Sequence, residues 1–283
     1  MLVEEHSTIS ELEKIEIELL LEGIYRHYGF DFRDYAFSSI RRRIVNRKQA
    51  EGLNSISELQ AKVLHHHEYL DRLLNDLSIN VTEMFRDPTF FKSFRENVVP
   101  HLRKLPFIRI WHAGCSSGEE AYSMAILLKE EGLYDKVKIY ATDMNEDILE
   151  RAAEGKIPLH QMQLYTKNYH QAGGTQEFSE YYTVYQDYVK LHPTLRKNMV
   201  FAHHNLATDY SFNEFHVVIC RNVMIYFNKH LTDRVYDLIF RSLSEGGFLG
   251  LGSKEAMTGN DKANLYREID STEKIYQKVS TFD

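Results

Sequence analysis

The alternation of short apolar runs with amphipathic stretches from Phe107 onward constrains the fold of this chain more than any other feature. Apolar runs bounded by polar turns predict strands, and apolar residues at three- and four-residue intervals predict helices. We expect strands at 107–111, 137–141, 215–220 and 248–251, and helices at 119–131, 146–153 and 231–243. Strands that alternate with helices indicate a parallel sheet with crossover helices on its faces. Runs at 265–269 and 274–279 flank a polar turn and predict a hairpin, and so one antiparallel strand.

Two other regions have a different pattern. The first 80 residues contain no proline and no strand-like alternation, and their leucines and isoleucines recur at helical spacing, which predicts a small helical bundle. Within it we expect Ser38 or Ser39 to cap a helix that reaches about Glu51, and Ser57 to begin the next helix. The polar, tyrosine-rich segment at about 161–200 is interpreted as a small β-rich insert, because structureless loops of this length are uncommon.

The charge and the composition exclude several classes of protein. With 34 lysines and arginines against 41 acids, the net charge is −7, so the molecule as a whole is not built to neutralise a nucleic-acid backbone. No apolar run reaches the roughly 18 residues of a membrane span, and the acidic N-terminus lacks a signal-peptide pattern. Two cysteines cannot make a disulfide framework, which indicates reduced thiols and a cytoplasmic location.

The segment 110–120 predicts a strand that passes through a small-residue loop into a helix. Gly114 and Gly118 allow a tight turn and a close approach to a ligand at the helix N-terminus. Glu119 and Glu120 stand where the phosphates of a dinucleotide would lie, which argues for a ligand with cationic or hydroxyl groups instead.

The same loop permits a second interpretation. Gly114-x-Ser116-x-Gly118 also matches the nucleophile elbow of serine hydrolases, which requires a later acid and a histidine. Candidate histidines exist, but no spacing distinguishes one of them; they are His203, His204 and His216.

Polar residues follow two other predicted strands. Asp143 ends the second strand, where a carboxylate can accept hydrogen bonds from both hydroxyls of a ribose; alternatively it only caps the next helix. Arg221 and Asn222 end the apolar run at 215–220 abruptly, so they should emerge at the carboxyl edge of the sheet, although Arg221 could instead form a structural ion pair. A nucleoside ligand without a pyrophosphate suggests S-adenosylmethionine.

Five motifs stand in order along the chain. They are Asn80-Val-Thr82-x-x-Phe85-Arg86-Asp-Pro, Gly118-Glu-Glu-x-Tyr122-Ser, Thr-Asp143, Asn205-Leu206 and Cys-Arg221-Asn222-Val-x-Ile-Tyr226-Phe. Together they resemble the CheR-type family, S-adenosylmethionine-dependent protein-glutamate O-methyltransferases that modify bacterial chemoreceptors. The resemblance implies an α/β fold class in which a helical domain at 1–79 and a linker at 80–106 precede a doubly wound, Rossmann-like methyltransferase domain at 107–283. It also implies a small β subdomain inserted at about 161–200.

The resemblance assigns roles to individual residues. It implies that the cofactor, whose product is S-adenosylhomocysteine, contacts Asn80, Thr82, Arg86, Ala113, Gly114, Glu119 or Glu120, Asp143, Asn205, Leu206, Arg221 and Asn222. Glu120 matches the family better than Glu119, and Arg86 and Tyr226 are the positions expected to matter for transfer. A glutamate acceptor is already ionised at pH 7, so no general base is required, and we expect Arg86 and Tyr226 to orient the carboxylate.

A basic stretch lies between Tyr35 and Ala50, where five cations and no acid occur: Arg41, Arg42, Arg43, Arg47 and Lys48. A solvated helix face is the default interpretation, but in an acidic protein such a stretch can dock an acidic partner. In the family, a basic helix faces the helical, glutamate-bearing region of the receptor, so these residues are our candidate partner contacts. Nucleic acid is less supported, because no set of stacking aromatics accompanies the arginines.

Several alternatives stay open at this point. The chain could be a cofactor-binding adaptor without turnover, a methyltransferase of another protein or of RNA, or a serine hydrolase that acts through Ser116. The insert is hard to align with the family's β subdomain, which binds a receptor tether in some members. His65, His66 and His67 do not predict a metal site, because consecutive helical residues point in different directions. We expect a monomer.

Overall fold

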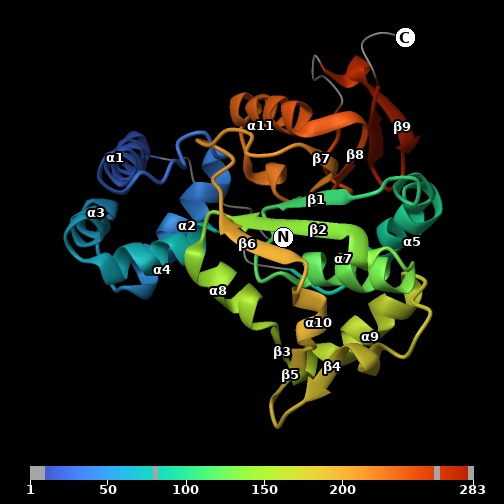
Figure 1. Cartoon of the computed structure of the whole chain (residues 1–283). Helices are drawn as coiled ribbons and strands as arrows, with labels where there is room; N and C mark the ends of the chain where they lie inside the picture. The colour runs from blue at the N-terminus through green and yellow to red at the C-terminus, as the bar shows by residue number, and fades with distance from the viewer. Residues whose placement is uncertain (1–9, 79–81, 258–261, 280–283) are drawn as a thin grey trace, which may run out of the picture. The chain divides into compact units, whose positions relative to one another are not determined.

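The computed structural model describes residues 10–78, 82–257 and 262–279, and Figure 1 traces them. The chain divides into two compact units, a helical unit of residues 1–79 with 226–231 and an α/β unit of residues 80–225 with 232–283. Within the described ranges, no helix has both the length and the apolar character that a membrane span requires. Each unit is described by itself below.

Residues 10–78 of the helical unit form the helices α1 (Glu11–Tyr28), α2 (Phe37–Ala50), α3 (Ile56–His65) and α4 (His67–Leu77). Ser10 caps α1 and Ser55 caps α3, since each side chain accepts a backbone N–H three residues ahead at 3.1 Å. The expectations that Ser38 or Ser39 caps α2 and that Ser57 begins α3 were both wrong. Helix α2 begins at Phe37 without a side-chain cap, and α3 begins one residue before Ser57.

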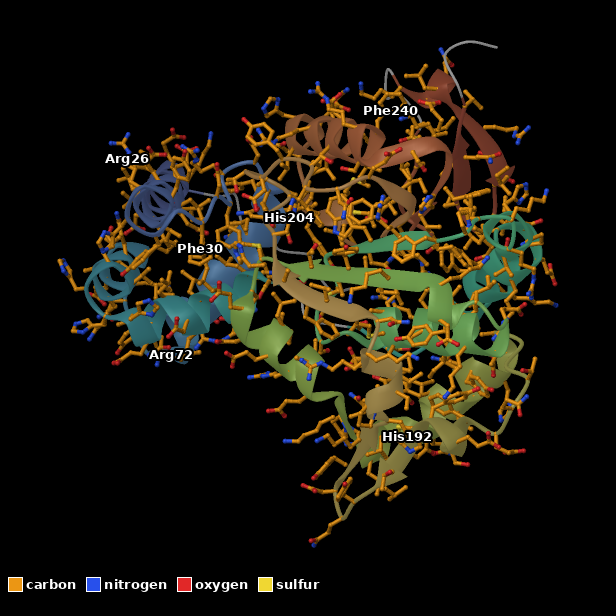
Figure 2. The ribbon with its side chains drawn as sticks, in the orientation of Figure 1. Arg26, Phe30, Arg72, His192, His204 and Phe240 are labelled. Carbon is orange, nitrogen blue, oxygen red and sulfur yellow. The ribbon has the colours of Figure 1, made fainter. Side chains whose placement is uncertain are left out.

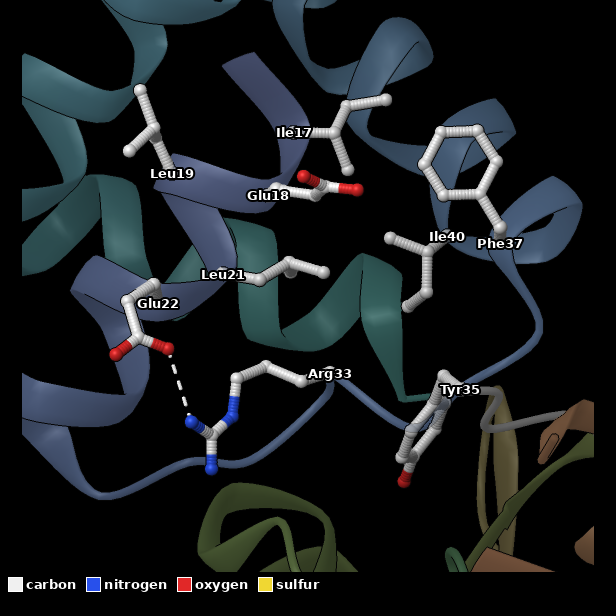
Figure 3. Close-up of a pocket in the computed structure, with 9 residues that line it drawn as sticks. All are labelled: Ile17, Glu18, Leu19, Leu21, Glu22, Arg33, Tyr35, Phe37 and Ile40. Atoms are coloured by element: carbon white, nitrogen blue, oxygen red, sulfur yellow. Dashed lines mark hydrogen bonds and ion pairs between the residues drawn. The ribbon is translucent and has the colours of Figure 1, made fainter. Parts of the chain in front are cut away.

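A cavity of about 410 Å³ lies beside α1 in the helical unit (Figure 3). Its wall is mostly apolar and includes Ile17, Leu21 and Ile40, while Glu22 and Arg33 form an ion pair of 3.0 Å at its edge. The cavity therefore combines a hydrophobic wall with neutralised charge.

The segment 226–231, which we call the arm, packs with the helical unit although it follows the strands of the α/β unit in sequence. The N–H of Ala36 donates to the carbonyl of Tyr226 at 2.8 Å, and Tyr35 and Phe227 form an antiparallel bridge with ring centroids 4.9 Å apart. The N–H of Asn228 donates to the carbonyl of Asp34 at 2.8 Å. Backbone pairing and ring contact together fix the arm on this unit.

The α/β unit is built on a sheet whose strands, in chain order, are β1 (Ile108–Ala113), β2 (Val137–Asp143), β6 (Met199–His203), β7 (Phe215–Cys220), β8 (Leu243–Leu251), β9 (Tyr266–Asp270) and β10 (Ile275–Lys278). Their spatial order is β6-β2-β1-β7-β8-β10-β9. The first five are parallel, whereas β10 runs antiparallel to both of its neighbours. The prediction of a parallel sheet with one antiparallel strand is confirmed; β6 was not anticipated.

The helices of this unit cover both faces of the sheet. Helices α7 (Glu119–Glu130) and α8 (Glu146–Glu154) lie over one face and α11 (Lys229–Ser242) over the other, as Figure 1 shows. This follows from right-handed crossovers, because the chain moves from β1 to β2 in one direction and from β7 to β8 in the other.

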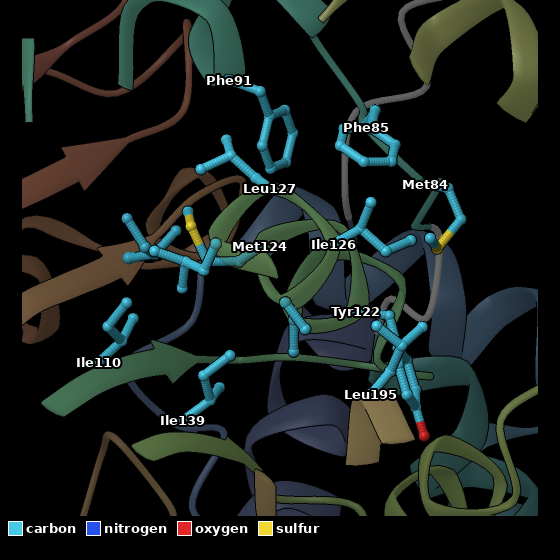
Figure 4. Close-up of a cluster of buried hydrophobic side chains, with 14 of the residues drawn as sticks. Met84, Phe85, Phe91, Ile110, Tyr122, Met124, Ile126, Leu127, Ile139 and Leu195 are labelled. Atoms are coloured by element: carbon cyan, nitrogen blue, oxygen red, sulfur yellow. The ribbon is translucent and has the colours of Figure 1, made fainter. Parts of the chain in front are cut away.

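The core of the α/β unit also includes the stretch expected to be a linker. Residues 80–106 contain α5 (Pro88–Asn97) and α6 (Val99–Leu102), and α5 packs against α7. Phe85 and Phe91 lie in the same buried cluster as Met124 and Leu127 of α7 (Figure 4). This stretch is therefore mostly a folded part of the α/β unit.

The insert departs from the β-rich expectation. It has a three-stranded antiparallel sheet, in the order β3-β5-β4, of β3 (Lys156–Pro158), β4 (Tyr182–Val184) and β5 (Tyr188–Leu191). Residues 162–171, however, form helix α9 (Met162–Gln171), so the expected strand character was wrong there. Met162, Tyr165 and Tyr169 are buried at helical spacing, and the aromatic residues disguise this periodicity because they also favour strands. Short segments complete the unit: η1 (Tyr134–Lys136), η2 (Leu159–Gln161), η3 (Phe178–Tyr181), α10 (Pro193–Arg196), η4 (Met224–Tyr226) and η5 (Ala263–Leu265).

Candidate cofactor site

The carboxyl edge of the sheet carries polar loops after three adjacent strands, β2, β1 and β7. After β1, the N–H groups of Gly114 and Cys115 both donate to the carbonyl of Thr142, at 2.8 and 2.9 Å. Gly114 has φ 78°, and a Cβ added there would lie 2.6 Å from a methyl carbon of Val223. Only glycine therefore permits both this turn and its close approach to the loop after β7.

Asp143 ends β2 as a buried carboxylate held by backbone donors. Its Oδ2 accepts the N–H of Ser116 at 2.9 Å, and its Oδ1 accepts the N–H of Asn145 at 3.1 Å. Burial raises the pKa of Asp143, although these N–H groups oppose the rise. An ionised carboxylate has about four acceptor positions, so it can also receive hydroxyl donors such as those of a ribose.

Glu120 and Arg221 form the charged centre of the edge. Glu120 bonds Nδ1 of His112 at 2.9 Å and Nη1 of Arg221 at 3.1 Å. Nη2 of Arg221 donates to Asp87 at 2.8 Å, and the guanidinium lies 4.1 Å from the ring centroid of Phe90. Burial alone would raise the pKa of Glu120, but the His112 hydrogen bond and the Arg221 charge outweigh it and lower the pKa. Glu120 is thus held as a carboxylate.

Glu119 differs from its neighbour. Its side chain accepts a hydrogen bond from Ser117 Oγ at 2.7 Å, and burial raises its pKa. Of the two acids that the sequence left open, Glu120 is the one that pairs with the Arg221 guanidinium.

Asn205 and Leu206 follow β6, the edge neighbour of β2, and both are buried. The side-chain oxygen of Asn205 accepts the N–H of Ala207 at 2.9 Å, so this asparagine shapes its own turn. The preceding His204, labelled in Figure 2, donates its backbone N–H to the carbonyl of Asp143 at 3.0 Å. This loop is therefore tied to the end of β2.

The remaining candidate site residues do not all lie in the loops after β1, β2, β6 and β7. Ala113 is buried at the end of β1, and the carbonyl of Arg86 accepts a hydrogen bond from Arg221 at 3.3 Å. The Thr82 carbonyl accepts from the Tyr165 hydroxyl at 3.4 Å, and Asn80 lies outside the described residues. Tyr226 belongs to the arm of the helical unit, where the Arg43 guanidinium lies 5.2 Å from its ring centroid.

Three of the five cations on α2 have partners within the helical unit, and two of these three are paired with acids. Arg41 pairs with Glu13 at 2.6 Å, and Arg47 pairs with Asp76 at 2.6 Å and with Glu51 at 3.1 Å. Arg43 donates to the carbonyl of Leu77 at 2.9 Å, and burial lowers its pKa. The expected row of five available cations is therefore wrong for these three arginines, while Arg42 is exposed and Lys48 is half-buried. The neutralising acids come from α1, α4 and the end of α2, which the local sequence could not show.

Other features raised by the sequence gain no support as sites. The hydroxyl of Ser116 is buried and has no hydrogen-bond partner among the described residues, so no described histidine activates it as a nucleophile. Cys115 and Cys220 are free and buried, and burial raises their pKa well above the usual value. His65, His66 and His67 are exposed, and α3 ends there, so they do not share one helix as expected.

Glu255 was not among the residues expected from the sequence. This buried carboxylate lies four residues after β8 and accepts N–H groups from the loop after β7. An acid shortly after a buried strand was a usable signal, but the local sequence does not show which loop it would reach.

The edge fits a polar nucleoside ligand. Buried side-chain atoms without a hydrogen-bond partner in the described residues include Ser116 Oγ, His204 Nδ1 and Arg221 Nε. Such unsatisfied groups are costly unless a ligand or water pairs them. With the acceptor Asp143 and the glycine loop, the α/β unit has the features of the doubly wound proteins that bind a nucleoside cofactor at their strand ends.

Comparison with known proteins identifies the family. The family described as CheR methyltransferase, SAM binding domain, matches residues 80–275, and its all-alpha domain matches residues 15–78. The chain belongs to the CheR methyltransferase family, and its cofactor is S-adenosylmethionine. The predicted family, fold class and cofactor are confirmed.

Two relatives illustrate the similarity. Cher3 of Pseudomonas putida is 47% identical over 93% of this chain and 97% of its own length. The chemotaxis protein methyltransferase of Listeria monocytogenes is 31% identical over 82% of this chain and 86% of its own length.

Proposed function

We propose that this protein transfers the methyl group of S-adenosylmethionine to glutamate side chains in the cytoplasmic helical region of a chemoreceptor. The products are a glutamate methyl ester and S-adenosylhomocysteine. The observation that carries the proposal is that the family match includes the all-alpha domain at 15–78 as well as the cofactor domain. A relative of similar length is named a chemotaxis protein methyltransferase.

In this proposal the carboxyl edge holds the cofactor. Asp143 binds the ribose hydroxyls, and Asn205 and Leu206 contact the adenine. The other proposed contacts lie toward the methionine part and the reacting methyl: Asn80, Thr82, Arg86, Ala113, Gly114, Glu120, Arg221 and Asn222. The buried Arg221–Glu120 pair gives this part of the site a fixed charge arrangement.

The proposed reaction needs alignment more than proton transfer. A glutamate carboxylate, ionised above a pKa of about 4.3, attacks the methyl carbon in line with the departing sulfur. The oxygen–carbon bond forms as the carbon–sulfur bond breaks, and the carboxylate and sulfonium charges disappear together. Arg86 and Tyr226 orient the acceptor. Of the α2 cations, Arg42 and Lys48 are the proposed contacts with the acidic partner.

A labelling experiment tests the proposal. The protein is incubated with methyl-labelled S-adenosylmethionine and membranes that contain a chemoreceptor, and the labelled product is then treated with base. We expect label on the receptor that base releases as methanol, because a methyl ester is hydrolysed whereas a methylated amine is not. A receptor with its candidate glutamates replaced by glutamine is the matched control and should take up none.

The alternatives give different results in the same assay. Base-stable label on another protein or on RNA would contradict the glutamate acceptor. Cofactor binding without any transfer would instead indicate an adaptor.

A further inference from the structure

Glu255 lies in the loop after β8 and is only 5% exposed. Its Oε2 accepts the backbone N–H of Asn222 at 2.8 Å and of Gly252 at 2.7 Å. Its Oε1 accepts the N–H of Val223 at 2.9 Å and of Met224 at 2.8 Å. One buried carboxylate thus receives four backbone donors, three of them consecutive.

The three consecutive donors belong to the turn after β7, beside the proposed cofactor contacts Arg221 and Asn222. Asn222 has φ 60°, a left-handed conformation that is uncommon for residues other than glycine. Successive N–H groups that converge on one point form an anion-binding concavity, and here the anion is a side chain of the same unit. Because the carboxylate accepts these part-buried and buried N–H groups, it stabilises the unusual turn.

The turn is tightly enclosed by two other loops. A Cβ added at Gly252 would lie 2.7 Å from Oε2 of Glu255 and 2.8 Å from the nitrogen of Asn222. On the other side, a Cβ added at Gly114 would lie 2.6 Å from Val223. Glu255 therefore ties together the loops that follow β8 and β7, and the β7 loop packs directly on the glycine loop after β1.

We infer that Glu255 is a positioning residue of the cofactor site. Glu255 does not contact the cofactor itself, but it fixes the turn that presents Arg221 and Asn222. The inference rests on the proposed placement of the cofactor at this edge. It assigns Glu255 a role in cofactor affinity that a merely stabilising carboxylate would not have.

The test compares Glu255→Gln with Glu130→Gln in the full chain. Glutamine keeps the shape of Glu255 but has one acceptor oxygen, and its NH₂ group would face N–H donors. Glu130 is a matched control, because its side chain is 1% exposed and pairs with Arg95 at the opposite end of α7 from the glycine loop. The 12 residues of α7 at about 1.5 Å per residue separate the two ends of the helix by about 18 Å.

Both variants should unfold at lower temperature, but only Glu255→Gln should weaken binding. We expect its Kd for S-adenosylhomocysteine, measured by titration calorimetry, to rise by about tenfold or more, as small displacements in aligned sites can produce. The KM for S-adenosylmethionine should rise together with this Kd. The kcat at saturating cofactor should fall by a smaller factor than the factor by which the KM rises. Glu255→Asp, which keeps the charge, should recover part of the affinity.

The inference is overturned if Glu255→Gln lowers the melting temperature as Glu130→Gln does and still binds S-adenosylhomocysteine like the wild type. Should Glu255→Gln not fold, wild-type affinity in a destabilised Glu255→Asp would overturn it equally. A wild-type protein that binds no S-adenosylhomocysteine would be a different failure, because it removes the proposed function itself.

Discussion

Arg221 illustrates the cost of placing a charge inside this edge. Its side chain is 1% exposed, and its guanidinium is shared between Glu120 and Asp87. Glu120 is the less exposed of the two partners, and its removal would leave Arg221 paired only with the 40% exposed Asp87, at a cost of up to about 3–5 kcal/mol. The arrangement is therefore rigid, which suits a site that must hold a cofactor in one orientation.

Tyr226→Phe tests the role of one hydroxyl. Phenylalanine keeps the ring beside Arg43, so we expect unchanged stability and an unchanged Kd for S-adenosylhomocysteine. Turnover should fall by about 10- to 100-fold, because the acceptor carboxylate loses an orienting contact. Steady-state methyl transfer and calorimetry measure the two effects. Tyr210→Phe, at an 82% exposed tyrosine, is the control; weakened cofactor binding with normal turnover in Tyr226→Phe would contradict the assignment.

Residues at strand ends were the part of the candidate site that the sequence could predict. Asp143 and Arg221 follow apolar runs directly, so their place at the carboxyl edge follows from strand direction alone. The partners of Arg41 and Arg47 were not predictable, because Glu13 and Asp76 lie on other helices. Glu255 was missed for the same reason, since three of its four donors lie about 30 residues earlier in the chain.

At the scale of elements, long periodic segments were predictable and short ones were not. Strands β1 and β7 were predicted to within two residues at each end, because buried parallel strands are continuous apolar runs. Strand β6 and helix α9 were missed or misread, since their burial depends on neighbours far away in sequence, such as β2 and α5. The start of α2 was wrong because no side chain caps it.

Helix α2 combines two roles that neighbouring arginines can separate. Arg43→Ala removes the hydrogen bond to the Leu77 carbonyl and the contact with the Tyr226 ring. We expect it to lower the free energy of unfolding by about 1–3 kcal/mol and to reduce turnover, because the Tyr226 ring loses a contact that holds its orientation. Calorimetry and the methyl-transfer assay measure both effects, and Arg43→Lys should restore part of each.

The exposed Arg42 provides the comparison on the same helix. Arg42→Ala should leave the melting temperature unchanged and raise the KM for the receptor, an increase that high salt should reduce. Equal losses of stability in the Arg42 and Arg43 variants would contradict this division of roles.

At the scale of the whole molecule, the two units differ in how self-contained they are. The apolar cluster around α7 lies wholly within residues 84–275, so the α/β unit contains its own core. The helical unit is completed by the arm, which is supplied by a later part of the chain. Methyl transfer should therefore depend on both units, whereas cofactor binding should depend on the α/β unit alone.

Deletion of residues 1–79 tests this difference. The remaining fragment should fold and bind S-adenosylhomocysteine, but it should lose methyl transfer because Tyr226 loses Ala36 and Arg43 as partners. Fluorescence of the single tryptophan, the buried Trp111, reports folding of the fragment, and calorimetry reports binding. A fragment that retains full turnover would show that the helical unit does not support the arm's function.

The arm also has a consequence during synthesis on the ribosome. Residues 1–79 emerge before the arm, whose last residue, 231, follows 152 residues later. At about 5–20 residues per second, the helices wait roughly 8–30 s for the arm. The nascent helical segment therefore spends this interval with the surface for the arm uncovered, a period in which a chaperone or a neighbouring nascent chain can bind it.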